Sequence, residues 1–402
     1  MALIPDAPAT PVIVSLTTGV FAELEKKNNN IVSEIHENGI PEYARAAIDK
    51  LYGSLYASVR YLELCRPYHP MPHTWIGYQQ GEIHAVLLFE IKDHTLIVLS
   101  EMIGLTDEQI ENFSQSVLAR YPAVMRINFN AIYLNFNKIK LANQNYIFSE
   151  NYILNLPKNI ENYQSKLGRA TRKTIRLYGN RLHKDFPDFQ WRVFHANELP
   201  RALQQTFLLQ LQAFKHESMV ARNKKSDNDP AETRRILQLA SESGLFGMAV
   251  INGEIRSGSL ACRIGNNYVM LISAADPALE KYRLGLLTCY WSLCDCIARG
   301  AQQCHLLWGR YPYKSQLLAI PKDLRRLTVY RSHWVMASMF ASVLHITLQA
   351  QKFRLQKWLL YEVQQRPDLC SRLLAQLVFT VREYKRKLGR PDASLRNGAE
   401  PH

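Results

Sequence analysis

The stretch DPALEKYRLGLLTCYW occupies residues 276–291, and LLWGRYPYK at 306–314 closes the same region of the chain. Asp276 followed by Pro277 is a typical cap and first-turn pair of a helix. Gly285 then lies near the start of a long apolar run, which predicts a helix. A strand that leads through such a turn into a helix presents free backbone N–H groups and a positive dipole end, which suit a pyrophosphate. An ordinary connection, in which glycine eases close packing, fits the same residues.

The bulk composition describes a folded protein with a preference for anionic partners. The 402 residues suggest two to three domains, and 47% of them are hydrophobic. The formal net charge of +14 favours nucleic acid, phosphorylated cofactors or acidic lipid surfaces. Seven cysteines without framework spacing indicate reduced thiols in a cytoplasmic protein. The N-terminus shows no secretory signal, and the longest apolar run, at 334–348, is shorter than the ~20 residues of a membrane span.

The hydrophobic pattern predicts two halves with a similar order of elements. In the first half we expect a helical region at 31–66, two or three strands within 73–101, a helix at 106–121 that begins at Thr106, and a strand at 123–134. The second half is expected to begin with a basic helix at 156–182, a strand at 189–196, and helices at 199–219 and 231–243 around a loop at 222–230. We then expect three strands within 245–275, a helix at about 283–299 and a strand at 302–309. From 322 onward the pattern predicts helix, with 14 Lys and Arg against 4 Asp and Glu up to Arg390.

The region 253–314 resembles the acetyltransferase domain of bacterial polysaccharide-biosynthesis-associated proteins, within the GNAT superfamily. That group has a hairpin with spaced glycines before a Leu, an Asp followed by Tyr and Gly, a helix that ends in Arg-Gly, and a closing segment with Gly, Tyr and Lys. The matching residues are Gly253, Gly258, Leu260, Asp276, Tyr282, Gly285, Arg299, Gly300, Gly309, Tyr313 and Lys314. The same resemblance extends to the Fem-type aminoacyltransferases, which build peptidoglycan cross-bridges from two GNAT-like halves.

The resemblance implies a donor-binding loop around Gly285. The expected cofactor-binding residues are Tyr282, Arg283, Leu284, Gly285, Leu286 and Leu287. The usual GNAT loop has Gln or Arg at the first of these positions and a small residue at the last, whereas this chain has Tyr282 and Leu287. The side chain of Leu287 is expected to crowd a pyrophosphate close to the backbone. This departure argues against acetyl-CoA and leaves another acyl-CoA or an aminoacyl-tRNA open as the donor.

The loop LLWGRYPYK supplies the first pair of candidate catalytic residues. In the resembling families the Lys of this closing segment lies near the reacting centre, which here implies Lys314, with Tyr313 beside it. A donor near the carbonyl oxygen helps an acyl transfer, because the reaction passes through an oxyanion. We also expect this loop to be exposed. A solvated basic turn whose tyrosines pack on the core is the alternative.

Two further groups are candidates for binding or catalysis. Arg169, Arg172, Lys173 and Arg176 recur at i, i+3, i+4 and i+7, which predicts a cationic helix face able to bind an RNA backbone, a CoA phosphate or acidic lipid. His216 and Glu217 end a predicted helix in a region that faces the acceptor in the resembling families, so either could act as general base. A solvated charged face and a helix-capping histidine are the structural alternatives.

No metal site is expected. Cys289, Cys294, Cys296 and Cys304 have no C-x2-C spacing, and Cys294 points away from the face that Cys289 and Cys296 share. Small apolar packing explains these cysteines better.

The sequence therefore predicts a mixed α/β protein with two GNAT-like lobes and a C-terminal helical tail. The expected domains are 1–150, a GNAT-like lobe that is a candidate for degeneracy, 151–330, the acyltransferase lobe, and 331–402, a basic amphipathic tail. We expect a cytoplasmic transferase that moves an acyl or aminoacyl group to an amine or hydroxyl of a small molecule or a polysaccharide precursor. The alternative is a non-catalytic protein that docks on RNA or on the inner membrane surface through its basic tail.

Overall fold

A computed structural model describes residues 32–358 except 68, 135–138 and 222–229. Its centre is one mixed sheet in the order β1-β2-β3-β4-β6-β13-β7-β12-β11-β10-β9-β8, with β5 paired to β6. The first-half strands are β1 (Val32–His36), β2 (His73–Gln79), β3 (Glu82–Lys92), β4 (Thr95–Val98), β5 (Ile103–Leu105), β6 (Arg126–Leu134) and β7 (Asn143–Asn155). The others are β8 (Gln190–His195), β9 (Gly244–Ile251), β10 (Glu254–Ile264), β11 (Asn267–Ala275), β12 (Gln303–His305) and β13 (Ile320–Tyr330).

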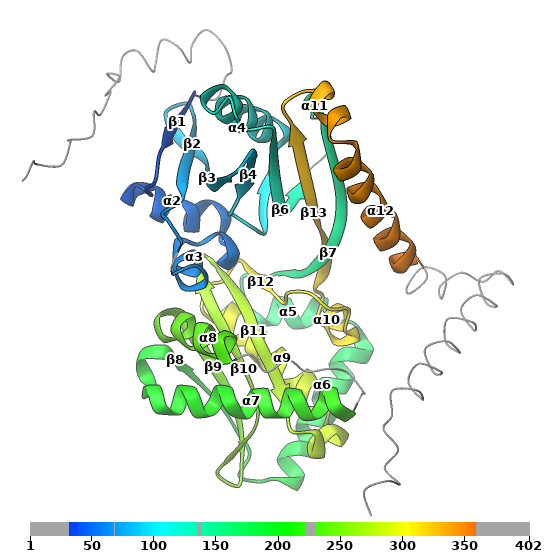
Figure 1. Ribbon diagram of the computed structural model, residues 1–402. Helices are drawn as coiled ribbons and strands as arrows, with labels where there is room; N and C mark the ends of the chain where they lie inside the picture. The colour runs from blue at the N-terminus through cyan, green and yellow to red at the C-terminus, as the bar shows by residue number, and fades with distance from the viewer. Residues whose placement is uncertain (1–31, 68, 135–138, 222–229, 359–402) are drawn as a thin grey trace, which may run out of the picture.

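The helices are distributed over both halves of this sheet, so the protein has a mixed α/β fold with two lobes (Figure 1). The first lobe carries α2 (Glu42–Tyr52), η1 (Leu55–Ala57), α3 (Val59–Cys65) and α4 (Asp107–Arg120). The second carries α5 (Ile160–Lys166), α6 (Arg169–Asp185), η2 (Ala196–Glu198), α7 (Arg201–Ala221), α8 (Pro230–Ser243), η3 (Pro277–Tyr282), α9 (Leu284–Ala298) and α10 (Pro312–Gln316). The order helix, helix, strands, helix, strand occurs twice, from α2 to β6 with four strands in the middle and from α7 to β12 with three. The expected similarity of the two halves is thus visible in the structure.

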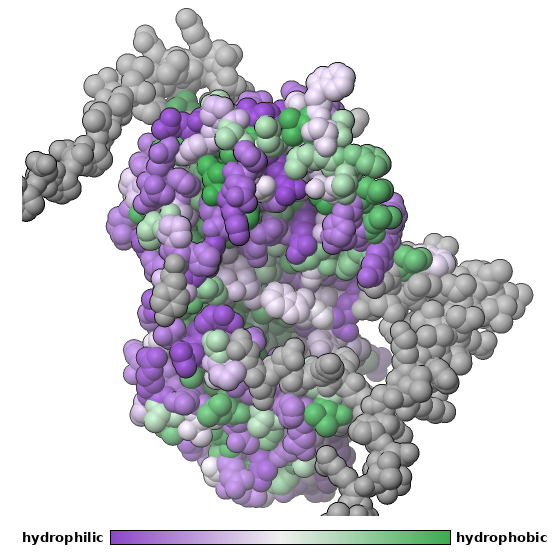
Figure 2. Space-filling view, in the orientation of Figure 1, coloured by the Kyte–Doolittle hydropathy of each residue, from purple (hydrophilic) through white to green (hydrophobic). Residues whose placement is uncertain are grey.

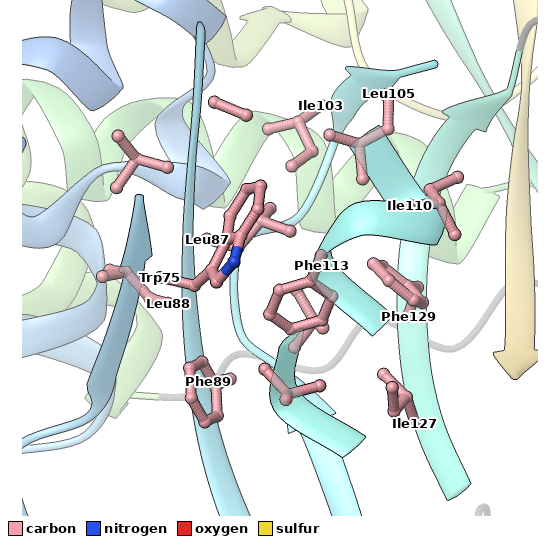
Figure 3. Close-up of a cluster of buried hydrophobic side chains, with 14 of the residues drawn as sticks. Trp75, Leu87, Leu88, Phe89, Ile103, Leu105, Ile110, Phe113, Ile127 and Phe129 are labelled. Carbon is pink, nitrogen blue, oxygen red and sulfur yellow. The ribbon is translucent and has the colours of Figure 1, made fainter. Parts of the chain in front are cut away.

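The first lobe has an aromatic core between its sheet and α4 (Figure 3). The ring of Phe113 on α4 lies 5.4 Å from Trp75, 5.8 Å from Phe89 and 5.7 Å from Phe129, each in an edge-to-face arrangement. Such aromatic pairs add stabilisation beyond their buried area. The amphipathic pattern predicted for 106–121 therefore places α4 as expected, with the Thr106 hydroxyl accepting from the Gln109 N–H at its start.

The second lobe is layered on both faces of its part of the sheet. Helices α7 and α8 pack on one face of β10 and β11, with Phe207, Leu208 and Leu211 among their buried side chains. Helix α9 packs on the opposite face, and α5 and α6 pack against α9. The three strands predicted within 245–275 are confirmed as β9, β10 and β11.

Strands β7 and β13 connect the lobes. They pair antiparallel from Asn143↔Val329 to Ile153↔Ile320, and the far end of β7 also pairs with β12 through Ile153↔His305. β13 lies between β6 and β7, so the chain returns to the first lobe after it has built the second. The helix α11 (His333–Ser338) and the helix α12 (Phe340–Lys357) follow, and α12 packs along β7.

Several sequence predictions are wrong in detail. The region 31–66 begins with strand β1 before its helices, and β7 and β13 are strands that the pattern did not predict. β7 reads NQNYIFSENYILN, a polar strand that is fixed by pairing on both edges rather than by its own composition. The predicted helix 156–182 is two helices, because the Arg169 start of α6 follows a break at Leu167 and Gly168. The predicted loop at 222–230 and the tail beyond 358 lie almost entirely outside the described residues.

Candidate active site

The parallel strands β11 and β12 diverge in the second lobe. They pair at Asn267↔Gln303, Tyr268↔Cys304 and Val269↔His305, and no later pair joins them within the described residues. Beyond His305 the chain follows β7 instead, since the Leu306 N–H donates to the Tyr152 carbonyl at 2.8 Å. We call the gap between residues 270–275 and residues 306–308 the wedge. Its β11 side keeps peptide groups in extended geometry, to which an extended amide ligand could pair.

The turn after β11 is built as the sequence predicts. Asp276 Oδ1 accepts from the Ala278 N–H at 2.8 Å and caps η3, while Asp276 Oδ2 pairs with Arg256 at 2.9 Å. Arg283 then adopts a left-handed conformation with φ of 51° and begins α9 without a side-chain cap. Its carbonyl accepts from the N–H groups of Leu286 and Leu287. The first two N–H groups of α9, those of Leu284 and Gly285, have no intrahelical acceptor.

The space over this helix start is open. A Cβ built on Gly285 would meet only the Ala275 Cβ, at 3.9 Å, which is ordinary contact. Gly285 is therefore not required by close packing, and the packing alternative for this residue loses its support. The helix dipole and the two N–H groups make the position suited to an anion.

The expected crowding by leucine is wrong. Leu287 is fully buried and packs with Leu284, Leu182 and Ile251, and Leu286 faces the core on the other side of α9. Both side chains are taken up by these two buried clusters, which lie on different faces of α9. The steric argument against acetyl-CoA therefore falls away.

The Tyr282 side chain has a structural role. It is 3% exposed, its hydroxyl donates to Asp185 Oδ2 at 2.8 Å, and its ring packs 5.3 Å from Phe186. Tyr282 thus ties η3 to the end of α6 and offers only its backbone to a ligand. Arg283 remains exposed, with its guanidinium 5.6 Å from the Tyr178 ring.

Lys314 is buried, which corrects the expectation of an exposed loop. It is 2% exposed, and its ammonium donates to the carbonyls of Leu306, Leu307 and Trp308 at 2.7, 3.0 and 2.8 Å. Burial lowers the pKa of Lys314 to about 8, while the three accepting carbonyls favour the charged form. All three protons are used, so Lys314 holds the segment that leaves β12.

That segment carries backbone strain. Leu307 has a φ of 55°, a conformation that is rare for a residue with a branched side chain. Strained residues persist only where their surroundings hold them, and they gather at functional sites. Lys314 contacts the carbonyls on both sides of this residue and so fixes the divergence of β12 from β11.

Tyr313 lies at the foot of the wedge. It is half-buried on α10 and hydrogen-bonds Cys289 of α9, whose Sγ lies 3.3 Å from Ser273 Oγ on β11. Burial raises the pKa of the Tyr313 phenol, so it is protonated at neutral pH and can donate a hydrogen bond. The elements α10, α9 and β11 therefore contact one another at Tyr313, Cys289 and Ser273. Arg310 of the same loop is paired with Glu150.

The cationic face of α6 is only partly available. Arg172 donates through Nη1 to the carbonyls of Ser165 and Leu167 and so closes the end of α5. Arg169, Lys173 and Arg176 are exposed on the same side of the helix. His216 and Glu217 are also exposed, in the last turns of α7. The structure thus keeps all four predicted anion-binding residues at the surface, although Arg172 is also engaged with α5, and it does not bring the two α7 residues into contact with Lys314.

The structure contains a buried polar cluster beside the wedge that the sequence did not predict. Asn151 on β7 donates to the Tyr133 hydroxyl at 2.8 Å and to His305 Nδ1 at 3.1 Å. With Nδ1 accepting, His305 carries its proton on Nε2, and that atom and Asn151 Oδ1 are buried without a hydrogen-bond partner among the described residues. Burial and the Lys322 charge lower the pKa of His305 to about 4, so it is neutral at pH 7. The only sequence signal was a histidine next to Cys304.

The described residues contain no group of three or more His, Cys, Asp or Glu side chains placed to hold a metal ion. Cys289, Cys296 and Cys304 are buried, and Cys294 is half-buried.

Comparison with known proteins finds a match within the second lobe. Residues 169–315 match the sequence model of the acetyltransferase (GNAT) domain. The match includes β11, α9, β12 and the Lys314 loop, so it covers the wedge and the helix start described above. No curated protein matches the chain at the significance required.

Solved structures extend this likeness to both lobes. FemX superposes with a TM-score of 0.55 at 11% sequence identity and covers 76% of this chain and 99% of its own. The lysylphosphatidylglycerol synthase structure from Bacillus licheniformis has a TM-score of 0.44 at 12% identity, over 74% of this chain and 94% of its own. At such identities the FemX likeness shows the fold, which is the GNAT and Fem type that the sequence motifs indicated.

Proposed function

We propose that this chain is an N-acyltransferase that uses the second lobe to hold an acyl or aminoacyl donor with an anionic carrier. The observation that carries the proposal is the wedge together with the uncapped start of α9. In the wedge the edge of β11 beyond Val269 pairs with no strand among the described residues, so an extended donor arm would pair with it. The N–H groups of Leu284 and Gly285, with the exposed Arg283, meet phosphate at the end of that arm.

The donor carrier is a CoA or a tRNA. Both carry phosphates, and both place a carbonyl at the end of a thin arm. The absence of leucine side chains over Gly285 keeps acetyl-CoA and longer acyl-CoAs in the set. The exposed cations Arg169, Lys173 and Arg176 favour a tRNA backbone, because such contacts depend on charge rather than sequence.

The acceptor is an amine or a hydroxyl of a small molecule or a polysaccharide precursor that enters from the face of α7 and α8. Figure 2 shows the surface of this face hollowed between the two lobes. Trp308 is 54% exposed there, 5.9 Å from the Tyr56 ring of the first lobe. Aromatic rings at such a position suit the apolar face of a sugar or an alkyl chain.

The reaction is a direct transfer. The acceptor nitrogen or oxygen attacks the donor carbonyl carbon, the bond from that carbon to the carrier sulfur or oxygen breaks, and the acceptor loses a proton. The neutral His305 offers an Nε2–H near the last pair before the strands diverge, where it can polarise the donor carbonyl. The protonated Tyr313 can pass a proton to the departing carrier, and the deprotonating base is His216 or Glu217 or solvent.

Thermal unfolding with a panel of ligands tests the proposal. Acetyl-CoA, longer acyl-CoAs, CoA alone and aminoacyl-tRNA are each added to the full chain, and a binding donor raises Tm by mass action. A shift with at least one of these, followed by transfer to a panel of amino sugars and amines detected by mass spectrometry, supports the enzyme. Salt-sensitive binding of RNA of any sequence, without a shift by any acyl donor, supports the non-catalytic alternative and excludes the transferase.

A further inference from the structure

The helix α12 packs on β7, and α11 packs on β13. Gln144 Nε2 on β7 donates to the Val343 carbonyl and to Thr347 Oγ1, both at 3.2 Å. Tyr146 donates to Gln349 at 3.2 Å. These contacts fix which side of α12 faces the sheet and which side faces outward.

The outward side of α12 is apolar. Phe340, Leu344, Leu348 and Leu355 are 67, 44, 60 and 55% exposed, and the spacing of four, four and seven residues places them on one helix face. Trp334 of α11 is 87% exposed beside them. We call these five residues the apolar ridge. Figure 2 shows hydrophobic side chains gathered along α12, in contrast to the polar surface of the first lobe.

The exposed charges on the described part of α12 are positive. Lys352 and Arg354 are exposed on α12, on either side of the ridge. From residue 332 to residue 361 the sequence contains no Asp or Glu. An aromatic and leucine face flanked by cations has the composition of a helix that lies in a membrane interface. Among the described residues no helix is long and apolar enough to cross a membrane.

The positive charge beside the apolar ridge indicates which kind of partner binds there. A second copy carries the same formal net charge of +14, and like charges oppose its approach. The remainder of this chain, residues 359–402, is also net basic. It contains eight Lys and Arg and five Asp and Glu. An anionic lipid surface supplies the opposite charge and accepts the apolar side chains at once.

We propose that the apolar ridge of α11 and α12 docks the protein on an anionic membrane surface, with Trp334, Phe340, Leu344 and Leu348 inserted among the lipids. The helices lie parallel to the surface, because their other side is held by β7. This proposal is independent of the transferase activity. It gives the chain a place from which a membrane-bound acceptor becomes accessible.

Vesicle flotation tests the proposal with the full-length protein. The vesicles contain equal amounts of phosphatidylglycerol and phosphatidylcholine, or phosphatidylcholine alone. The test variant combines Phe340→Ser, Leu344→Ser and Leu348→Ser. The matched control combines Leu177→Ser, Leu203→Ser and Leu209→Ser, whose side chains are 55, 53 and 49% exposed on α6 and α7. Thermal unfolding establishes that both variants fold.

We expect the wild type and the control to bind the anionic vesicles, with weaker binding to phosphatidylcholine alone. The ridge variant should bind at least ten-fold more weakly. Equal binding by the ridge variant would overturn the proposal, as would a wild type that does not float. If the ridge variant instead changes only the mass measured by sedimentation, the ridge is an interface between copies and the membrane proposal fails.

A second readout uses tryptophan fluorescence. Brominated lipids quench tryptophans that enter the bilayer. Trp358 ends α12, so Trp334→Phe is combined with Trp358→Phe, and both changes keep an apolar ring. We expect quenching in the wild type and its loss in this double variant. Quenching that persists in the double variant would place another part of the surface on the membrane and contradict the assignment.

Discussion

The two lobes have the same order of elements but opposite chemistry where a GNAT donor would lie. In the second lobe β11 and β12 separate after three pairs, whereas in the first lobe β4 pairs with β6 along its whole length and β5 continues the pairing up to Leu105↔Leu134. The Met102 N–H also donates to the Ala131 carbonyl at 2.6 Å and closes the space between these strands. The first lobe therefore has no wedge.

The helix that follows these strands also differs between the lobes in its suitability for an anion. α4 begins with a capping box in which Thr106 and Gln109 satisfy each other, and Asp107 and Glu108 occupy its first turn. α9 has neither a side-chain cap nor an acidic residue in its first turn. Two carboxylates repel an anion that two free N–H groups attract. The duplicated topology thus preserves the scaffold in both lobes and the anion site in one, and we propose that the first lobe binds no donor.

The largest effect is expected from the cation that holds the wedge open, which has no counterpart among the described residues of the first lobe. Lys314→Met leaves three buried carbonyls without a donor, so the free energy of unfolding should fall by about 3 kcal/mol or more. Urea denaturation measures this. A loss below about 1 kcal/mol would mean that Lys314 acts chemically, as the sequence indicated, and does not hold the fold.

The second effect concerns the last pair of β11 with β12, Val269↔His305, whose position in the first lobe is taken by the pair Val98↔Phe129. The pKa of His305 is lowered to about 4, so the unfolded chain binds its proton at a higher pH than the folded chain does. The free energy of unfolding should therefore fall as the pH drops from about 6.5 to about 4, by about 3 kcal/mol from this residue. His305→Gln should flatten the curve measured by urea denaturation at each pH. Parallel curves for both proteins would contradict the assigned pKa.

The third effect tests the anion site directly. Gly285→Val places a branched side chain over the first turn of α9, so donor affinity should fall at least ten-fold while Tm without ligand changes little. Gly179→Val is the matched control, since Gly179 is also helical and a Cβ there meets nothing within 4 Å. Isothermal titration with the donor that stabilises the wild type measures both. Equal loss in the two variants would argue against a site at Gly285.

The smallest effect belongs to the other lobe. Thr106→Ala removes the cap of α4 and should cost about 1 kcal/mol of stability without changing donor affinity. Urea denaturation and the same titration separate the two quantities. A change in donor affinity would show that the first lobe takes part in donor binding.

The elements that carry strong local signals could be predicted from the sequence. The Thr106 cap, the glycine turns at Gly253 and Gly265, and the apolar run of α9 set their structures locally. β7 could not be predicted, because its polar residues form a strand only between β13 and β12. The direction of Leu287 and the burial of Lys314 also depended on packing between α9, α10 and β12, which no sequence pattern records.

The pairing of Ile153 with Ile320 has a consequence for biosynthesis. The segment between these two residues is inserted into a hairpin of the first lobe, and its two ends lie side by side. The ribosome releases all of that insert before it releases β13, which fills the place between β6 and β7. The N-terminal lobe, although synthesised first, is therefore the last to complete its sheet, and its open edges at β6 and β7 must await a partner that is still inside the exit tunnel.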